Sequence, residues 1–498
     1  MEMEIIYTSL SFFAIIFFLY KIILSKPKNK NLPPSPPSLP ILGHLHLLKA
    51  PFHRTLQSLS QRYGPIFFLR LGCQPVLVVT SSWAAEECFS KNDIVFANRP
   101  KFIIGEHLGY NHSLLIWSPY GDYWRNLRRV TTITMLSLRR INEAGPTRKI
   151  EIDNMISELL QGGTRKRVNL NAIFEKVARN FMMRVVNGKT WEKMIIRPPS
   201  NLMTICDFFP FLRWVGFNGI EKELRKLKKE RDEFLQSLVD ECRETRGGIS
   251  CDEQIGENTN LIEQLLDLQQ SEPEYYTDDV LKGIILVLIL AGSETTARTL
   301  EWAMSNLINH PAVFAKARAE IDVNVGKGRL VEDCDLSKLS YIRCIIYETL
   351  RLFPPAPLLV PHYSSQDCNI GGYDVPKGTI LFVNAWALHR DPNQWDDPTE
   401  FKPERFEKEK EGFKFMPFGI GRRACPGNNF ALRNVSLTLA TLIQCFDWEA
   451  TEAGKVDLTE KCSAGAVIVP KEKPLEATCC PRSSMEDTFS HKFDNVSV

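Results

Sequence analysis

Cys425 lies in the stretch FGIGRRACPG, residues 418–427, among three glycines, two arginines and a proline. A buried structural cysteine needs only apolar packing, so these neighbours indicate that the sulfur itself is used. An apolar helical pattern follows Gly427, which places Cys425 just before the expected N-terminus of a helix. The partial positive charge of that helix end favours a thiolate over a thiol. The stretch therefore predicts an anionic sulfur ligand for a metal ion.

The same stretch also matches a nucleotide-binding pattern. Gly419, Gly421 and Ala424 fit the G-x-G-x-x-A fingerprint of dinucleotide-binding loops. That fingerprint has to follow a strand, and Pro417 at the end of the preceding FKFMPF segment argues against a strand there. We therefore favour the metal-ligand interpretation over the nucleotide one.

Two further pairs of residues have helical spacing. Glu348 and Arg351, in ETLR, are separated by i, i+3 and share one face of a helix. Trp124 and Arg128, in WRNLR, are separated by i, i+4 and also share a face. Taken alone, a pair like the first is usually a surface ion pair, and an aromatic–arginine stacking pair is the alternative interpretation of the second.

Polar residues interrupt an apolar helical stretch at residues 284–307. The segment ILAGSETTART places Gly292 beside Glu294 and Thr295 in a run otherwise suited to burial. A glycine and nearby threonine hydroxyls can open the i→i−4 hydrogen-bond ladder and leave room for water. The segment predicts either a bent structural helix or a site that moves protons.

Phe418, Gly421, Arg423, Cys425 and Gly427 together resemble the F-x-x-G-x-R-x-C-x-G loop of the cytochrome P450 superfamily. The resemblance implies a haem b cofactor with Cys425 as the axial thiolate ligand of its iron. Such a ligand pushes electron density toward the iron, which favours O–O cleavage. The resemblance also implies that Arg423 pairs with a haem propionate through a charge-assisted hydrogen bond.

The other motifs follow in the order that this family has. Glu348 and Arg351 are similar to the family's E-x-x-R pair, which meets the arginine of a PERF segment, here Arg405. The resemblance implies a buried charge network of these three residues that serves folding and haem retention. Two arginines around one carboxylate leave a positive charge over, so we expect backbone carbonyls to join the network.

Three residues resemble the family's other propionate donors, and two resemble its oxygen-activation residues. Trp124 and Arg128 are similar to the W-x-x-x-R pair, and His362 in LLVPHYS aligns with a further donor position. Glu294 and Thr295 fit the pattern A-G-x-[DE]-T-[TS], which implies a relay that delivers protons to dioxygen.

The resemblance also places an apolar wall around the distal face of the haem. No lysine or arginine belongs to this wall, although Lys101 borders it. A pocket of this kind binds by burying apolar surface, so we expect a neutral, mostly planar phenolic such as an isoflavone or a lignan, with a terpenoid as second choice. The wall comprises Phe102, Ile103, Ile104, Leu114, Ile116, Leu290, Ala291, Leu358, Leu359, Val360, Ala466 and Val467.

The composition is that of a globular protein. Of the 498 residues 44% are hydrophobic, and a formal net charge of +2 gives no basic excess for nucleic acid. The 13 cysteines show no C-x-x-C pair and no zinc-ligand spacing, so we expect reduced thiols. Periodicity predicts a mainly α-helical chain with a minor β-sheet, and the resemblance implies a single catalytic domain with the cytochrome P450 fold over residues 42–480. Helices are expected at 220–246, 284–307, 311–325 and 339–352, and strands near 76–79 and within 371–383.

The two ends of the chain differ from this domain. Residues 5–24 are almost wholly apolar and long enough to span a bilayer, and the lysines that follow should stay cytosolic. A cleaved signal peptide is the alternative, but its positive charge would precede the apolar run. We expect residues 1–30 to form a membrane anchor with a basic flank, residues 31–41 a stiff proline-rich hinge, and residues 481–498 a polar, disordered tail.

The resemblance implies a plant enzyme on the cytosolic face of the endoplasmic reticulum membrane that uses O2. No flavin or nicotinamide domain is recognisable, so electrons are expected from NADPH through a partner, the NADPH–cytochrome P450 reductase. Arg125, Arg129, Lys414 and Arg422 form either a basic docking face for that partner or a set of solvated charges. The motifs are most similar to those of the branch that contains isoflavone hydroxylases and sesamin synthases.

Two alternatives stay open. A haem-thiolate isomerase or dehydratase needs no external electrons, but such enzymes tend to lose the threonine that Thr295 retains. A catalytically impaired haem-binding protein is the second alternative. The reason for this second alternative is the region around residues 190–206, which is shorter by about a helix than the family leads us to expect.

Overall fold

The computed structural model describes most of the chain. It covers residues 31–161, 165–190, 203–247, 260–408, 412–451, 454–461 and 467–492, together with residues 7, 9–14, 16 and 17. Residues 191–202 lie outside the described part, so the shortening around 190–206 stays a prediction.

The β-strands are short. They are β1 (Ile66–Leu71), β2 (Gln74–Val79), β3 (Lys166–Asn169), β4 (His362–Tyr363), β5 (Cys368–Ile370), β6 (Tyr373–Val375), β7 (Ile380–Val383), β8 (Phe446–Ala450) and β9 (Glu476–Pro481). The main sheet has the order β1-β2-β7-β4, in which β2 pairs antiparallel with β1 and parallel with β7. The strands expected near 76–79 and within 371–383 are thus confirmed as parts of β2, β6 and β7.

Helices make up most of the remaining structure. The α-helices are α2 (Phe52–Tyr63), α3 (Ser82–Phe89), α4 (Ile103–His107), α5 (Asp122–Thr131), α6 (Leu138–Glu143), α7 (Gly145–Leu160), α8 (Leu170–Asn187), α9 (Ile205–Phe208), α10 (Phe211–Trp214), α11 (Ile220–Gly247), α12 (Leu261–Ser271), α13 (Asp278–Asn309), α14 (Pro311–Asn324), α15 (Ser340–Leu352), α16 (Ala385–Leu388), α17 (Asn428–Cys445) and α18 (Glu486–Lys492). Single helical turns and short segments are η1 (Leu45–Leu47), η2 (Thr132–Leu136), η3 (Phe217–Gly219), η4 (Asp333–Lys338), η5 (Pro403–Glu407) and η6 (Ser483–Met485). The four long helices expected from periodicity are confirmed as α11, α13, α14 and α15.

Local sequence explains several helix ends. Pro311 occupies the first turn of α14, where its missing N–H is not needed. The side chain of Asn169 caps α8 by accepting the N–H of Ala172 at 3.0 Å. The same helix ends at Gly188, whose φ of 76° is the left-handed conformation that glycine adopts easily.

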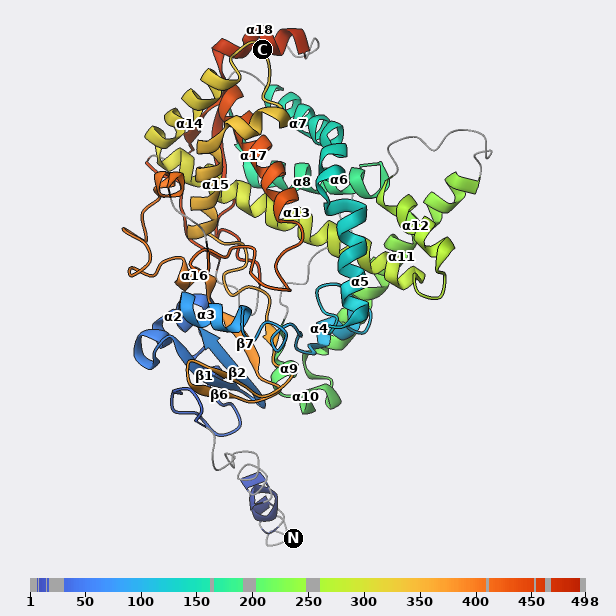
Figure 1. Ribbon diagram of the computed structural model, residues 1–498, viewed down its shortest axis with the longest axis vertical. Helices are drawn as coiled ribbons and strands as arrows, with labels where there is room; N and C mark the ends of the chain where they lie inside the picture. The colour runs from blue at the N-terminus through green and yellow to red at the C-terminus, as the bar shows by residue number, and fades with distance from the viewer. Residues whose placement is uncertain are drawn as a thin grey trace.

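The helix α13 crosses the middle of the helical part, and the sheet of β1, β2 and β7 lies toward the opposite end from α14 and α18 (Figure 1). The first half of α13 packs in the core that contains residues of α4 and α11, and its second half packs in the core that contains residues of α15 and α17. Of the described helices, α13 alone is long and apolar enough to cross a membrane, and 56% of its apolar window is buried. Helices at the centre of a globular core meet the same criteria, so this helix positions residues inside the fold.

The expected membrane anchor, residues 1–30, falls largely outside the described residues. The residues described there, 7, 9–14, 16 and 17, are helical. Their large apolar side chains are exposed, for example Leu10 at 60% and Phe13 at 68%. A transmembrane helix at this end of the chain therefore stays a prediction.

The proline-rich hinge, residues 31–41, runs without a helix or a strand, as its prolines predict. It is fastened to the sheet by its backbone. Pro34 O accepts the N–H of Phe68 in β1 at 2.8 Å, and Pro36 O lies 2.8 Å from Nε2 of the buried His44. These contacts join residues 34 and 36 to the folded domain, and the stiffness of the hinge stays a prediction.

The expectation of a disordered tail is wrong for residues 483–492, which form η6 and α18. Met485 and Phe489 are 0% and 1% exposed, and Phe489 stacks on Phe446 with ring centroids 6.0 Å apart. The hydroxyl of Thr488 donates to Lys327 O at 2.9 Å. The polar composition concealed two apolar residues at i, i+4 spacing, which dock this short helix on the core.

Candidate functional site

Cys425 lies in a loop that ends at α17. Its N–H donates to Phe418 O at 2.8 Å and closes the loop. Gly419 and Gly421 have φ values of 66° and 78°, which is the left-handed region that glycine reaches without strain. The helix begins at Asn428, so the cysteine stands just before a helix N-terminus, as the sequence predicts.

The pKa of this sulfur shifts in the opposite direction to the expectation. Burial raises the pKa of the Cys425 thiol and outweighs the lowering caused by the Gly427 N–H and by Arg128. In the absence of a metal ion the pKa of this thiol therefore shifts upward. A bound metal ion reverses the balance because a coordinating thiol loses its proton.

Open space adjoins both Cys425 and the middle of α13. The Cys425 side chain is exposed, although protein atoms surround it closely enough to desolvate the sulfur on its other sides. Ala291 is exposed as well, whereas Ile289 and Ala297 on the same helix are 5% and 0% exposed. A small residue in the middle of a core helix is exposed only where the packing leaves space beside it.

Three residues of the sequence motifs meet beside this loop. Arg423 is 9% exposed and donates to three backbone carbonyls, with its Nε 2.6 Å from Ala97 O. Arg128 Nη1 donates to Ala424 O at 2.6 Å. The ring of the buried Trp124 lies 4.4 Å from the guanidinium carbon of Arg423.

Arg99, which the sequence analysis missed, lies in the same cluster. It is 8% exposed, and its Nη1 donates to Val360 O and to Pro361 O, both at 2.8 Å. His362 directly follows Pro361 in the chain, and its Nδ1 lies 2.8 Å from Phe96 O. Arg99 and Val360 are 261 positions apart, so no local spacing could have connected them.

These buried side chains lack an acidic partner among the described residues. Burial and the nearby Arg128 lower the pKa of Arg423 to about 9. Burial and Arg423 lower the pKa of Arg99 well below its ordinary value, and burial and Arg99 do the same to His362. In the described part of the chain the hydrogen bonds of these groups go to backbone carbonyls, and none goes to a carboxylate. Buried cations need a counter-charge, so the donor set fits an anionic group.

Glu348, Arg351 and Arg405 meet, as their motifs imply. Glu348 and Arg351 are both 0% exposed and 2.6 Å apart, and Arg405 Nε lies 3.0 Å from the same carboxylate. The second positive charge is compensated by backbone carbonyls, because Arg351 Nη1 donates to His389 O and Pro398 O at 2.7 Å each. The three side chains form a closed buried network and not a surface bridge.

The polar segment of α13 is helical throughout. The helix assignment runs from Asp278 to Asn309, and a local opening of the ladder at Gly292 stays a prediction. An added Cβ at Gly292 would lie 2.6 Å from Met182 Sδ of α8, so a larger residue there requires the Met182 side chain to move. The hydroxyl of Thr295 donates to Ala291 O at 2.7 Å and therefore lies at the exposed alanine.

The surroundings of Glu294 raise the pKa of its carboxyl group. Burial raises its pKa, Arg298 lowers it, and Glu175 raises it further. Arg298 is itself occupied by an ion pair with Glu301 at 2.7 Å. A carboxyl with a raised pKa keeps its proton over a wider pH range, which suits a group that donates protons.

Much of the expected substrate wall belongs to one core cluster. Phe102, Ile103 and Leu114 are buried in the cluster that contains the first half of α13, and Leu290 and Leu358 pack at its edge. Along α13 the residues of this cluster extend to Leu290, and the next residue, Ala291, is exposed. The wall residues Val360 and Val467 are half-buried, and Ala466 lies outside the described residues.

Leu359 is an exception to the expected wall. It packs in the core of the main sheet with Leu77 and Val79, and is 7% exposed there. Its φ of 54° is left-handed, which is rare for a side chain of this size. The backbone turns at this residue, so Leu358 and Leu359 enter two different cores.

The comparisons with known proteins decide the family. A family model described as "Cytochrome P450" matches residues 33–477. The chain belongs to the cytochrome P450 family. It is 47% identical over 482 residues to cytochrome P450 81Q32 of Catharanthus roseus, which covers 93% of this chain and 94% of that protein. It is 46% identical over 514 residues to the (+)-piperitol/(+)-sesamin synthase CYP81Q2 of Sesamum radiatum, covering 98% of each. It is 44% identical over 499 residues to an isoflavone 2'-hydroxylase of Glycyrrhiza echinata, covering 96% and 97%.

These relatives make the chain a plant cytochrome P450 of the CYP81 branch and a monooxygenase with a haem b cofactor. The residues described above fit that cofactor. Haem b carries two carboxylates, and the buried Arg99 and Arg423 and the half-buried Arg128 lack carboxylate partners among the described residues. The thiol of Cys425 faces open space and can turn into a thiolate on binding a metal.

Two polar contacts that the sequence analysis missed hold α4 of this cytochrome P450 in place. Asp207 of α9 accepts the N–H of Ile103 at 2.7 Å and so supplies a partner for the first turn of α4. Arg213 of α10 forms an ion pair with Glu106 of α4 at 3.1 Å. The capping contact between Thr204 and Asp207 can be predicted from their spacing in the sequence. The bond from Asp207 to α4 cannot, because the two residues are far apart in the chain.

Proposed function

We propose that Cys425 is the axial thiolate ligand of the haem iron. The observation that carries this proposal is the position of an exposed sulfur in a glycine-rich loop directly before α17. We further propose that Trp124, Arg128, His362 and Arg423, together with Arg99, hold the propionates. When bound, haem b supplies the iron at which dioxygen is activated for the transfer of one oxygen atom.

We propose that this cytochrome P450 hydroxylates a neutral, lipophilic plant secondary metabolite, first of all a phenolic such as an isoflavone or a lignan, and otherwise a terpenoid. Support comes from the residues expected to line the pocket, which include no lysine or arginine and of which Phe102, Ile103 and Leu114 are buried in one apolar core cluster. Support also comes from two relatives, one named as a (+)-piperitol/(+)-sesamin synthase and the other as an isoflavone 2'-hydroxylase. Such a pocket gains its binding energy from buried apolar area and has no cation for an anionic substrate.

A substrate panel tests this proposal. With a plant reductase and NADPH, the membrane-bound enzyme is expected to turn over at least one member of a panel of neutral isoflavones, lignans and triterpenoids. It is expected to leave fatty acids unchanged, because burying their carboxylate without a partner is unfavourable. Product analysis by mass spectrometry measures one added oxygen atom. Turnover of fatty acids alone would contradict the assignment of the pocket.

We propose that Thr295 and Glu294 deliver protons during oxygen activation. Thr295→Ala is expected to keep the haem spectrum but to divert most reducing equivalents into hydrogen peroxide, because the hydroxyl that holds the proton is gone. Measuring peroxide and product per NADPH consumed tests this, with any substrate that the panel identifies.

Thr299→Ala is the matched control for that variant. Its hydroxyl donates to Thr295 O at 2.8 Å, the same type of back-bond one turn later in α13. Removing it disturbs the helix equally without removing the proposed proton donor. If Thr295→Ala and Thr299→Ala release the same fraction of peroxide, the relay is not at Thr295.

We propose that NADPH–cytochrome P450 reductase supplies the electrons and that the chain is anchored in the endoplasmic reticulum membrane with its catalytic domain in the cytosol. The exposed apolar side chains among residues 7–17 support an anchor. Of the four basic residues considered for docking, Arg422 donates to the hydroxyl of Tyr120 at 2.8 Å and Arg129 to Asn126 at 2.6 Å. These local contacts agree with a docking face and with solvated charges alike.

A further inference from the structure

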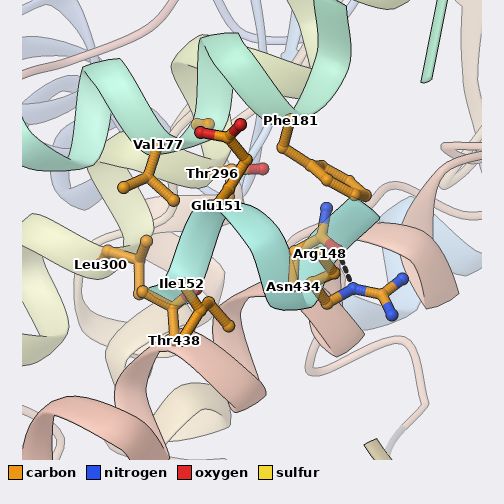
Figure 2. Close-up of a pocket in the computed structure, with 10 residues that line it drawn as sticks. Arg148, Glu151, Ile152, Val177, Phe181, Thr296, Leu300, Asn434 and Thr438 are labelled. Carbon is orange, nitrogen blue, oxygen red and sulfur yellow. Dashed lines mark hydrogen bonds between the residues drawn. The ribbon is translucent and has the colours of Figure 1, made fainter. Parts of the chain in front are cut away.

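A small cavity lies between the helices α7, α8, α13 and α17 (Figure 2). Its volume is about 20 Å³, which is room for about one water molecule. Five of the ten residues that line it are apolar. The polar or charged lining residues are Thr296 from α13, Asn434 and Thr438 from α17, and Arg148 and Glu151 from α7.

Thr296 and Thr438 depart from the behaviour of the threonines beside them. Thr295 and Thr299 in α13 and Thr441 in α17 donate to the carbonyl four residues earlier, at 2.7–2.8 Å. In the described part of the chain, no hydrogen bond involves the hydroxyl of Thr296 or of Thr438, although these residues are only 5% and 3% exposed. A buried hydroxyl without a partner is destabilising, so each of these two calls for one.

Asn434 carries a third polar group that has no hydrogen-bond partner among the described residues. Its Oδ1 accepts Arg148 Nε at 2.6 Å, the bond drawn as a dashed line in Figure 2. This contact assigns the orientation of the amide and leaves its Nδ2 as a donor that no described residue accepts. Glu151, 2% exposed, forms an ion pair with Arg184 and keeps free lone pairs on its carboxylate.

We propose that this cavity is a binding site for one water molecule, which joins the hydroxyl of Thr296 to that of Thr438, with Asn434 and Glu151 as further neighbours. A water molecule has two donors and two acceptors and needs two to four polar partners, and the lining offers that number. The bridge links α13, directly beside Thr295, to α17, the helix that follows the Cys425 loop. It holds these two helices in register.

Replacing a lining threonine by valine is expected to change the stability of the protein in opposite directions, depending on whether the cavity is hydrated or dry. Valine has nearly the volume of threonine but no hydroxyl. In a dry cavity, replacing an unpaired buried hydroxyl by a methyl group stabilises the protein. In a hydrated cavity the same replacement removes a hydrogen bond to the water and destabilises it. The effects of two residues that share one water also fail to add.

The test is a double-mutant cycle on the full-length, haem-loaded enzyme. We expect Thr296→Val and Thr438→Val each to lower the melting temperature by about 1 to 2 °C at one fixed scan rate. We expect the double variant to lower it by clearly less than the sum, because the second hydroxyl has already lost its shared partner. Two single variants that raise the melting temperature, or effects that add, would overturn the proposal.

Thr441→Val provides the matched control. Its hydroxyl already donates to Leu437 O at 2.8 Å and does not line the cavity, so its effect should add to that of Thr296→Val. Crystal structures give a measurement that does not depend on melting. We expect one solvent peak within hydrogen-bond distance of both hydroxyls in the parent enzyme, its retention in Thr438→Ser and its loss in the double valine variant. An empty cavity in the parent enzyme would contradict the proposal.

Discussion

Replacing Cys425 by alanine is expected to abolish the long-wavelength absorption that a thiolate-ligated haem shows when it is reduced and bound to carbon monoxide, together with all monooxygenase activity. The reason is that no other thiol is expected to take over the ligand role, because Cys425 alone stands in the glycine-rich loop before α17. The measurement is the reduced carbon-monoxide difference spectrum of the purified variant, normalised to total haem.

Cys334→Ala serves as the control for this variant. Cys334 is likewise exposed, but it lies in η4, away from the Cys425 loop. Its removal is expected to leave the spectrum unchanged. Cys425→Ser is an informative intermediate, since an oxygen ligand can retain haem while the thiolate absorption disappears. An unaltered spectrum in Cys425→Ala would show that another residue ligates the iron.

Glu348→Ala is expected to yield little or no haem-loaded protein, even when haem is supplied during expression. Removing this carboxylate leaves Arg351 buried at 0% exposure without its charge partner, with Arg405 beside it. Breaking a buried ion pair by removing one partner costs about 3–5 kcal/mol. That is a large share of the roughly 5–15 kcal/mol by which a folded protein is stable. The yield of haem per purified protein and the melting temperature measure the effect.

The control is an ion pair of the same kind on the surface. Glu230 lies 3.9 Å from Lys226 on α11, with side-chain exposures of 48% and 79%. Glu230→Ala is expected to change stability by no more than about 0.5 kcal/mol. Glu348→Gln, which keeps the shape but loses the charge, should fall between the two. Normal haem loading in Glu348→Ala would mean that the backbone carbonyls alone can hold both arginines.

Patterns within a few residues determined a large part of this protein. The long helices α11, α13, α14 and α15 follow from periodicity, and the position of Cys425 before α17 follows from the apolar pattern after Gly427. The contact of Glu348 with Arg351 follows from i, i+3 spacing. These features depend on interactions along one stretch of chain, so the order of side chains is enough to predict them.

Charge and burial at the site were decided by the tertiary structure alone. Arg99 joins Arg423 only because strands and loops bring together segments more than 250 positions apart, as its bond to Val360 across 261 positions shows. The pKa of Cys425 is raised because desolvation outweighs the Gly427 N–H and Arg128, and desolvation depends on every neighbour that packs against the sulfur.

Packing likewise sent Leu358 and Leu359 into different cores and turned the tail around Phe489 into a docked helix. Nothing in their own spacing distinguishes these residues from apolar residues that stay exposed. A side chain's partner is whichever group the rest of the fold brings within reach, and that choice is a sum over distant contacts. The sequence by itself therefore determined which chemical groups this cytochrome P450 carries and on which helices, and only the tertiary structure decided which of those groups are buried, which are paired and which await an anion.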